Sequence, residues 1–252
     1  MGDAEIRARR PAVWWIAHRW WAAIGFALVP VVLTGAASAA GQFQRFDDAA
    51  SAVVIAAGAA LSAIIGVIVM RVSPPRFSEY GFRSARAAKE VWWFVPLPVT
   101  VLLALVTQGV HVPGPVIAAY AALTVAVAVN EEVWFRGVVL AILRGRDART
   151  AIIGSAALFG ILHLANLASG QDLGASLLQL VFAVLFGFVA AELVVLTGSL
   201  WPSIAWHAMW DFANYLGGNS AAPAALIGIG IACVIMVVYA IVLWRRVERG
   251  AR

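Results

Sequence analysis

The chain has 252 residues, of which 63% are hydrophobic and only 12% are charged, and its mean hydropathy is +0.89. This composition excludes an ordinary soluble globular protein and indicates an all-α, polytopic membrane protein. Long uninterrupted apolar runs favour helices over the alternating pattern of a β-barrel. The net charge of +5 does not point to nucleic acid, because the basic residues lie mostly in short loops where they can contact anionic lipid.

The apolar runs predict about eight transmembrane helices within a single integral membrane domain, residues 1–252, at about 20 residues per crossing. In chain order they are Trp14–Ala37, Ala49–Val72, Val91–Val110, Val116–Leu143, Ala151–Leu167, Leu177–Leu196, Leu200–Leu216 and Ala222–Trp244. The fourth run is long for one crossing, so it should tilt or emerge from the membrane at its basic end. Pro96 and Pro98 should bend the third helix.

Lysine and arginine residues are distributed unevenly between the two sides of this array. With eight crossings only Arg45 falls in a loop on one side. The other side receives the remaining basic clusters, Arg7, Arg9, Arg10, Arg71, Arg76, Arg83, Arg86, Lys89, Arg144, Arg146, Arg149, Arg245, Arg246, Arg249 and Arg252. An excess of basic residues marks cytoplasmic loops, so both termini should be cytoplasmic. We expect a multi-pass protein of the cell membrane, of the bacterial inner-membrane type.

Three charged residues interrupt the fourth apolar run within six positions: Glu131, Glu132 and Arg136. A charge at membrane depth costs at least about 2.5–3.5 kcal/mol, so such residues are normally paired and functional. On a helix Glu132 and Arg136 stand four apart with the acid first, the favourable order for an ion pair, whereas Glu131 is rotated about 100° away. We expect the pair to brace the site and Glu131 to do chemistry; a cluster that only fixes helix packing is the alternative.

Two later helices carry ionisable residues in apolar surroundings. His163 ends the sequence Phe159-Gly160-Ile161-Leu162-His163, and His207 shares a helix face with Asp211, which Asn214 extends. At a rise of about 1.5 Å per residue, Glu131 and His163 both lie about 20 Å from the basic ends of their helices, with His207 shallower. The three helices can therefore converge inside the membrane.

These residue types favour hydrolysis. A carboxylate in a low-dielectric site can act as general base towards water, and a histidine can orient that water or stabilise the oxyanion that forms. Ser155, Ser199 and Ser203 lack the glycine context of a nucleophile elbow, and the zincin pattern is absent. No cofactor is firmly implied; if a metal is present, zinc bound by Glu131, His163 and His207 from separate helices is possible.

Together the three motifs resemble the CAAX-protease and bacteriocin-processing family of intramembrane endopeptidases, also called the ABI family. Its first motif, two glutamates, three residues and an arginine, matches Glu131-Glu132-Val133-Trp134-Phe135-Arg136, its second, Phe-x-x-x-His, matches Phe159 to His163, and its third, His-x-x-x-Asn or Asp, matches His207 to Asp211. The segment Tyr80-Gly81-Phe82-Arg83 resembles a Gly-Leu-Arg signature that precedes the family core. The resemblance covers roughly residues 80–216.

The resemblance implies an eight-helix fold in which Glu131 and His163 activate the hydrolytic water and His207 and Asp211 form the oxyanion site. Glu132 and Arg136 would support them. The prenyl-protein endopeptidases of the family carry Asn at the position of Asp211, and an ionised Asp cannot donate a hydrogen bond. Either Asp211 is protonated, or it orients His207 while Asn214 or a backbone amide donates.

The resemblance also implies a peptide or prenylated protein substrate, and a glutamate-and-histidine mechanism needs no metal. Two readings from other classes remain open. One is a proton-coupled transporter that uses the same buried polar residues as a relay. The other is a non-catalytic membrane scaffold or immunity protein that keeps the motifs for packing.

Overall fold

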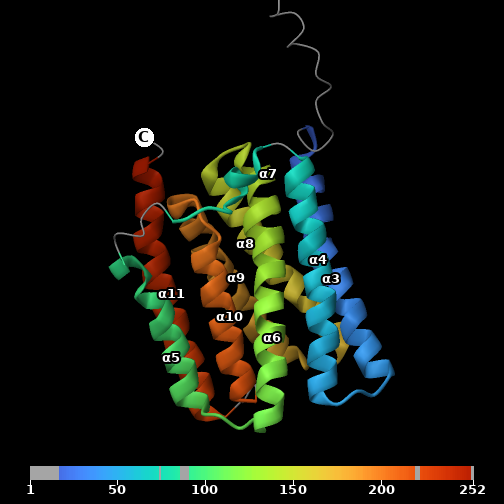
Figure 1. Cartoon of the computed structure of the whole chain (residues 1–252). Coiled ribbons are helices and arrows are strands. Elements are labelled where there is room, and N and C mark those ends of the chain that lie inside the picture. The colour runs from blue at the N-terminus through green and yellow to red at the C-terminus, as the bar shows by residue number, and fades with distance from the viewer. Residues whose placement is uncertain (1–16, 74, 86–90, 219–221, 251–252) are drawn as a thin grey trace, which may run out of the picture.

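The computed structural model describes residues 17–73, 75–85, 91–218 and 222–250, and within these ranges all regular secondary structure is helical. The long helices form one bundle (Figure 1). They are α3 (Arg19–Phe43), α4 (Asp48–Val72), α5 (Pro96–Gln108), α6 (Gly114–Glu131), α8 (Ala148–Leu162), α9 (Leu173–Thr197), α10 (Trp201–Leu216) and α11 (Pro223–Gly250). Shorter segments are η1 (Phe77–Tyr80), η2 (Val91–Phe94), η3 (Glu132–Val139), α7 (Leu140–Arg144) and η4 (His163–Ser169).

The protein is a polytopic helical membrane protein, as its composition predicts. Six helices of the described chain are long and apolar enough to cross a membrane, and one of these spans, Gly114–Arg144, combines α6, η3 and α7 in 31 residues. The apolar helices α5 and α10 are shorter, with 13 and 16 residues. Together these elements correspond one to one to the eight predicted runs.

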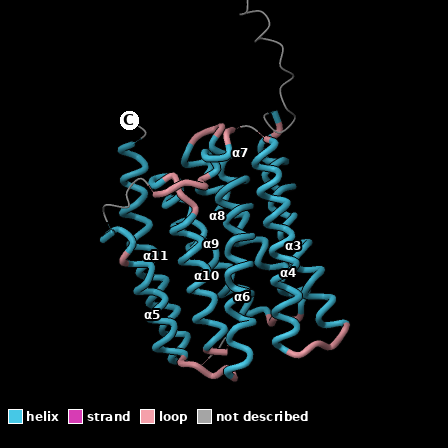
Figure 2. Tube along the Cα trace, viewed as in Figure 1, coloured by secondary structure: helices cyan, strands magenta, loops and turns pink. Residues whose placement is uncertain are grey.

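Loops gather at the two ends of the bundle (Figure 2). The helices alternate in direction, so α3 begins at the same end at which α11 finishes (Figure 1). The turn between α3 and α4, which carries Arg45, lies at the opposite end from the turn between α7 and α8, which carries Arg146. The described basic residues thus follow the predicted asymmetry. Arg7, Arg9, Arg10, Arg86, Lys89, Arg252 and the expected helix start at Trp14 lie outside the described residues.

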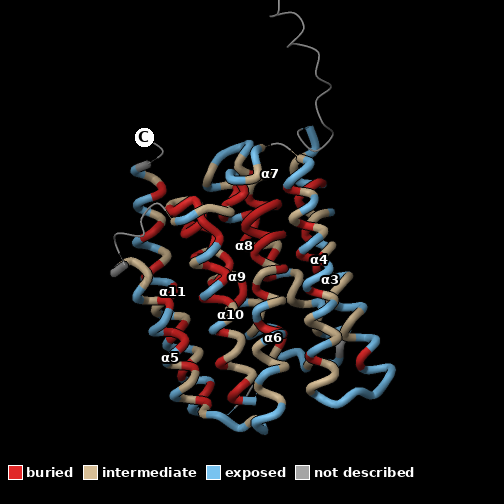
Figure 3. The backbone as a smooth tube through the Cα atoms, viewed as in Figure 1, coloured by how far each residue is buried: buried red, intermediate tan, exposed pale blue. Residues whose placement is uncertain are grey.

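Burial is concentrated at the centre of the bundle, in η3 and the neighbouring parts of α8, α9 and α10 (Figure 3). Of the most apolar 18 residues of α9, 56% are buried inside the protein, whereas the corresponding fraction in α3 is 22%. The helix α9 is therefore central and α3 is peripheral. Large apolar side chains such as Val32, Val106 and Val234 are exposed on the outer helices. In a membrane protein these side chains face lipid.

Three aspartates begin helices at the membrane boundary. The carboxylates of Asp47, Asp147 and Asp172 accept hydrogen bonds from the backbone N–H groups of Ala50, Thr150 and Ala175, each three residues on. An N-cap satisfies a backbone donor that has no partner in the first helical turn. Thr150 also donates its hydroxyl to Asp147, and these hydrogen bonds hold the pKa of the Asp147 carboxyl below its usual value.

One expectation about helix shape is wrong. Pro96 and Pro98 do not bend the third helix, because α5 begins at Pro96, in the first turn where the missing N–H of proline costs nothing. The fourth run contains a feature that was not predicted: a π-helix, η3, replaces the α-helix from Glu132 to Val139. Glu131, the last residue of α6, and Glu132, the first residue of η3, therefore lie where the helix changes from α to π geometry.

Candidate active site

The first motif lies on the π-helix η3, whose eight residues are all buried. Neighbouring helices hold it in place: Trp134 Nε1 donates to the Oγ and the carbonyl oxygen of Ser62 in α4, at 3.0 and 3.2 Å, and Ser155 Oγ in α8 donates to the carbonyl oxygen of Phe135 at 2.9 Å. Serine hydroxyls can satisfy backbone groups that an irregular helix frees inside a membrane. Short π-helical segments occur frequently at functional sites.

Glu132 and Arg136 form the expected ion pair. Their Oε1 and Nη1 atoms are 3.0 Å apart, and both side chains are fully buried. The guanidinium carbon of Arg136 also lies 4.0 Å from the centre of the Phe159 ring, a cation–π contact. A buried charge is costly unless it is paired, and here the paired charges lie on one turn of η3.

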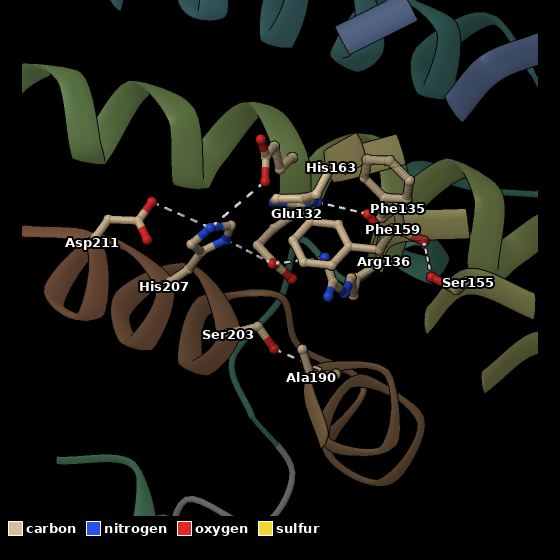
Figure 4. A network of polar contacts seen from close by, with 11 residues as sticks. Glu132, Phe135, Arg136, Ser155, Phe159, His163, Ala190, Ser203, His207 and Asp211 are labelled. Carbon is tan, nitrogen blue, oxygen red and sulfur yellow. Dashed lines mark hydrogen bonds and ion pairs between the residues drawn. The ribbon is translucent and has the colours of Figure 1, made fainter. Parts of the chain in front are cut away.

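His207 connects the acids of the first motif to the third motif. Its Nδ1 lies 3.0 Å from Glu132 Oε1, while its Nε2 faces Glu131 Oε2 at 3.6 Å and Asp211 Oδ2 at 3.4 Å (Figure 4). A carboxylate only accepts hydrogen bonds, so Nδ1 donates to Glu132. That bond fixes the orientation of the ring and directs Nε2 towards the two other carboxylates.

His163 joins the same cluster from the start of η4. Its Nδ1 lies 2.7 Å from the carbonyl oxygen of Phe159, which can only accept, so Nδ1 carries the proton and Nε2 is the acceptor of the neutral ring. The ring centres of His163 and His207 lie 4.6 and 5.9 Å from that of Phe159. The second motif therefore adds a histidine with a defined tautomer to the cluster (Figure 4).

Exposure separates two parts of the cluster. The side chains of Glu131 and Asp211 remain 20% and 27% exposed, whereas those of Glu132 and Arg136 are 0% exposed. Glu131 and Asp211 are therefore partly exposed, although the Glu131 oxygen that faces His207, Oε2, is itself buried. The geometry divides a partly exposed side of the cluster from a fully buried side.

Several buried polar atoms of the cluster make no hydrogen bond to any described residue. They are Nδ2 and Oδ1 of Asn130, Oε2 of Glu131, Oε2 of Glu132 and the three guanidinium nitrogens of Arg136, whose 3.0 Å contact with Glu132 is an ion pair without hydrogen-bond geometry. Buried polar groups are normally hydrogen-bonded to protein or to ordered water. A concentration of such donors and acceptors suits water, which typically makes 2–4 hydrogen bonds in a buried polar site.

The side-chain amide of Asn214 contacts α5 and its own helix and makes no hydrogen bond to the cluster. Its Nδ2 donates to the carbonyl oxygen of Trp210 at 2.8 Å, and its Oδ1 accepts from Nε2 of Gln108 in α5 at 2.8 Å. Both ends of the amide are thus occupied by contacts that join α10 to α5. The structure brings together Glu131, Glu132, Arg136, His163, His207 and Asp211.

The three residues named for a possible zinc ion, Glu131, His163 and His207, all belong to this cluster. Among the described residues no group of three or more His, Cys, Asp or Glu side chains is placed to hold a metal ion. Nδ1 of His163 is engaged by the Phe159 carbonyl and Nδ1 of His207 by Glu132. Histidines that bind a metal through Nε2 commonly make the same kind of contact at Nδ1.

Residues 113–213 match the family model described as Type II CAAX prenyl endopeptidase Rce1-like. The match covers less than half of the chain, and it agrees with the resemblance that the three motifs show. The matched segment contains the four predicted catalytic residues and the Glu132–Arg136 pair, and it ends before Asn214. No curated protein sequence matches the chain.

Two residues that shape the cluster without being ionisable were not predicted. Phe159 is 2% exposed and its ring contacts both histidines and Arg136. A Cβ atom on Gly187 in α9 would lie 3.1 Å from Nη2 of Arg136 and 3.2 Å from Cδ1 of Phe159, so any larger residue there would press on the arginine and the ring. Phe159 stands in the second motif, but no local pattern marks Gly187.

The segment that contains Gly81, Phe82 and Arg83 fixes the start of α10. Arg83 Nε donates to the carbonyl oxygen of Gly198 at 2.8 Å, and the backbone N–H of Leu200 donates to the carbonyl oxygen of Gly81 at 2.9 Å. The Phe82 ring contacts the edge of Trp201, with 6.0 Å between centroids. We call the hydrogen bond from Arg83 to Gly198 the Arg83–Gly198 clamp. Because α10 carries His207 and Asp211, the clamp positions the third motif.

Glu192 lies in α9 outside the cluster. Its side chain is fully buried, and neither carboxylate oxygen makes a hydrogen bond to a described residue. None of the ion pairs of the cluster includes it. It therefore provides an intramembrane acid for comparison with Glu131.

Proposed function

We propose that the protein is an intramembrane endopeptidase that hydrolyses a peptide bond with a water molecule activated by Glu131. The observation that carries the proposal is the placement of His207, whose Nδ1 is held by Glu132 while its Nε2 faces the partly exposed carboxylates of Glu131 and Asp211. A fixed donor beside a carboxylate base is what attack of water on a carbonyl requires.

In the proposed reaction Glu131 accepts a proton from water as the water oxygen attacks the carbonyl carbon of the substrate. Nε2 of His163 accepts a hydrogen bond from the same water and orients it. The negative charge that develops on the carbonyl oxygen is stabilised by the N–H at Nε2 of His207, whose ring is doubly protonated in this proposal because Nδ1 also donates to Glu132. Glu131 then returns the proton to the leaving nitrogen as the C–N bond breaks.

The remaining polar residues position His207. Glu132 accepts from Nδ1 and is itself held by Arg136 at 3.0 Å. Before substrate binds, Asp211 lies 3.4 Å from Nε2 and keeps the His207 ring oriented. The substrate carbonyl oxygen then replaces Asp211 as the acceptor for Nε2. Distances of 3.4–3.6 Å suit this role, because catalytic hydrogen bonds are often long before the substrate binds and shorten in the complex.

We further propose that the substrate is a peptide or a prenylated protein, that no metal takes part, and that the protein works in a cell membrane of the bacterial inner-membrane type. The family model is described as a CAAX prenyl endopeptidase, which supports the substrate class. A glutamate-and-histidine reaction needs no metal, because the carboxylate can take the proton from water and a histidine can stabilise the oxyanion.

The test is cleavage by the detergent-purified protein of a quenched prenylated CAAX peptide and of a library of unprenylated peptides. Glu131→Gln should lower the rate by about 10²–10⁴-fold, the usual contribution of a general base. Glu192→Gln is the matched control, because it neutralises another buried acid outside the cluster and should leave the rate within about two-fold of wild type.

A chelator should leave the activity unchanged. Loss of cleavage with chelator would refute the metal-free reaction, and equal loss in both glutamate variants would refute the role of Glu131. If the folded protein cleaves no peptide, proton flux in liposomes tests the transporter alternative: flux that Glu131→Gln abolishes would replace the endopeptidase proposal with a proton relay.

A further inference from the structure

A basic pocket lies at the end of the bundle where α9 and α11 meet η2, away from the candidate active site. It consists of two adjoining cavities, of about 390 and about 230 Å³, that share Trp93, Arg246 and Arg249 as lining residues. Arg245 lines the smaller cavity. We call this the α9/α11 pocket.

The polar side of the α9/α11 pocket is cationic. The guanidinium carbon of Arg246 lies 3.2 Å from the centre of the Trp93 ring, and Tyr239 donates a hydrogen bond to the carbonyl oxygen of Trp93. These contacts tie the pocket's aromatic wall to α11. The acid on the same turn, Glu248, forms an ion pair with Arg149, which does not line the pocket, at 2.9 Å.

The rest of the α9/α11 pocket is apolar. Leu193 and Leu196 of α9 and Leu243 of α11 line the larger cavity. Along α11 the pocket continues onto Val242, which lines the smaller cavity and is 38% exposed, and Val238, which is 57% exposed on the outer surface. The pocket thus changes from cationic at the end of the bundle to apolar towards its middle, in the order in which a phospholipid presents its headgroup and its acyl chains.

We propose that the α9/α11 pocket binds an anionic phospholipid, with its phosphate on Arg245 and Arg249 and an acyl chain along the exposed apolar face of α11. Arginine matches phosphate through paired N–H donors. Basic pockets between membrane helices on the positively charged side of a protein suit anionic headgroups. The larger cavity falls within the roughly 300–1,000 Å³ of typical ligand sites, which accommodates a headgroup but not two acyl chains.

The proposal is independent of the endopeptidase activity, and its test measures lipid binding. Native mass spectrometry of the full chain in detergent would compare phosphatidylglycerol with phosphatidylcholine. Wild type should bind phosphatidylglycerol at least about ten-fold more tightly, and the double variant Arg245→Gln and Arg249→Gln should bind it about 30-fold more weakly than wild type. Arg246 is retained in this variant because its stacking on Trp93 supports the local fold.

The matched control is the double variant Arg76→Gln and Arg146→Gln, which removes the same charge from exposed positions at the same end of the bundle but outside the pocket. It should bind phosphatidylglycerol within about two-fold of wild type. Equal weakening in both double variants would overturn the site, because it would show that only the total charge matters. Competition by soluble glycerol phosphate at millimolar concentration would overturn the lipid assignment in favour of a free phosphate.

A second measurement does not depend on the variants folding. Photo-cross-linking of wild type with a phosphatidylglycerol that carries a diazirine on its acyl chain should label α9 near Leu193 and Leu196 and α11 near Val238 and Val242. Labelling that an excess of phosphatidylglycerol suppresses, but phosphatidylcholine does not, supports the pocket. Labelling spread evenly over the outer helices would overturn it.

Discussion

The guanidinium of Arg136 is stacked on the ring of Phe159, with 4.0 Å between its carbon and the ring centre. The same ring contacts His163 and His207, so one apolar side chain of the second motif contacts a charged residue or histidine from each of the three motifs. Phe159 thereby determines the distance between the helices that carry these motifs.

Phe159→Leu should impair both stability and activity. Leucine keeps the site apolar but removes the cation–π contact, which is worth about 2 kcal/mol when desolvated. Displacement of the Arg136–Glu132 pair would move His207 and lower the cleavage rate by about 10²-fold. Thermal unfolding in detergent and peptide cleavage measure the two effects. Phe188→Leu is the control, because the Phe188 ring packs against Trp244, with 5.4 Å between ring centres, outside the cluster. Equal losses of stability and activity at both positions would show that Phe159 contributes only apolar packing.

Gly187→Ala should disturb the cluster from the side of α9. The added methyl would lie 3.2 Å from the Cα atom of Ala156 as well as against Arg136, and a backbone atom cannot turn aside. Overpacking of this kind costs about 1–3 kcal/mol. Gly230→Ala in α11 has open space at the same position and should be neutral or slightly stabilising. The comparison of unfolding midpoints decides; two indistinguishable variants would contradict the tight fit at Gly187.

The Arg83–Gly198 clamp can be tested by two glycine substitutions that share the same backbone strain. Gly198 and Gly218 both have φ of +69°, so alanine at either position costs about 1–2 kcal/mol. Only at Gly198 would the new methyl also collide with the guanidinium of Arg83, whereas Gly218 has nothing within 4 Å. Gly198→Ala should therefore lose more stability and, by shifting α10, at least about ten-fold in cleavage rate.

Arg83→Ala should reproduce the loss of activity of Gly198→Ala without adding backbone strain. It removes the 2.8 Å hydrogen bond to the Gly198 carbonyl and leaves the turn between α9 and α10 less constrained. If Gly198→Ala and Gly218→Ala cleave peptide at the same rate, the clamp does not position the third motif.

Asp211 can be distinguished as an acceptor or as an oxyanion donor by two replacements. Asparagine keeps a side-chain oxygen towards Nε2 of His207 and adds N–H donors, so Asp211→Asn should retain activity within about ten-fold. Asp211→Ala removes the contact of 3.4 Å and should lose about 10²–10³-fold, as removal of an oxyanion-site group does. An inactive Asp211→Asn would rule out the simple oxyanion role and require the carboxylate itself.

The helix pattern of the fold was predictable because each crossing is a long apolar run. The predicted run Ala49–Val72 differs from α4 (Asp48–Val72) by one residue. The π-helix was not predictable, because spacing rules assume 3.6 residues per turn. The contacts that hold η3 also come from other helices: Ser62 accepts from the Trp134 side chain, and Ser155 donates to the Phe135 carbonyl oxygen. Gly187 was missed for the same reason: its role arises only when α9 packs against Phe159.

The convergence of Glu131 and His207 followed from charge and depth alone, because ionisable side chains inside a membrane collect where they can pair. The bond between Glu132 and His207 did not follow, since a helix turn shows which residues share a face but not which neighbour lies opposite. Likewise, the sequence grouped Asn214 with the stripe of His207 and Asp211, whereas contacts with Gln108 draw its amide towards α5.

The π-helix has a consequence for how this chain is compared with others. Its hydrogen bonds run from residue i to i+5 instead of i+4, so it holds more residues in the same axial length than an α-helix does. The segments α6, η3 and α7 form one continuous helix, but the π-helix rotates α7 relative to α6. If the residues on one face are counted from Glu131 at α-helical spacing, the count therefore selects the wrong side chains beyond Val139. Residue-by-residue correspondence with a relative that has a plain α-helix here would hold on only one side of the site.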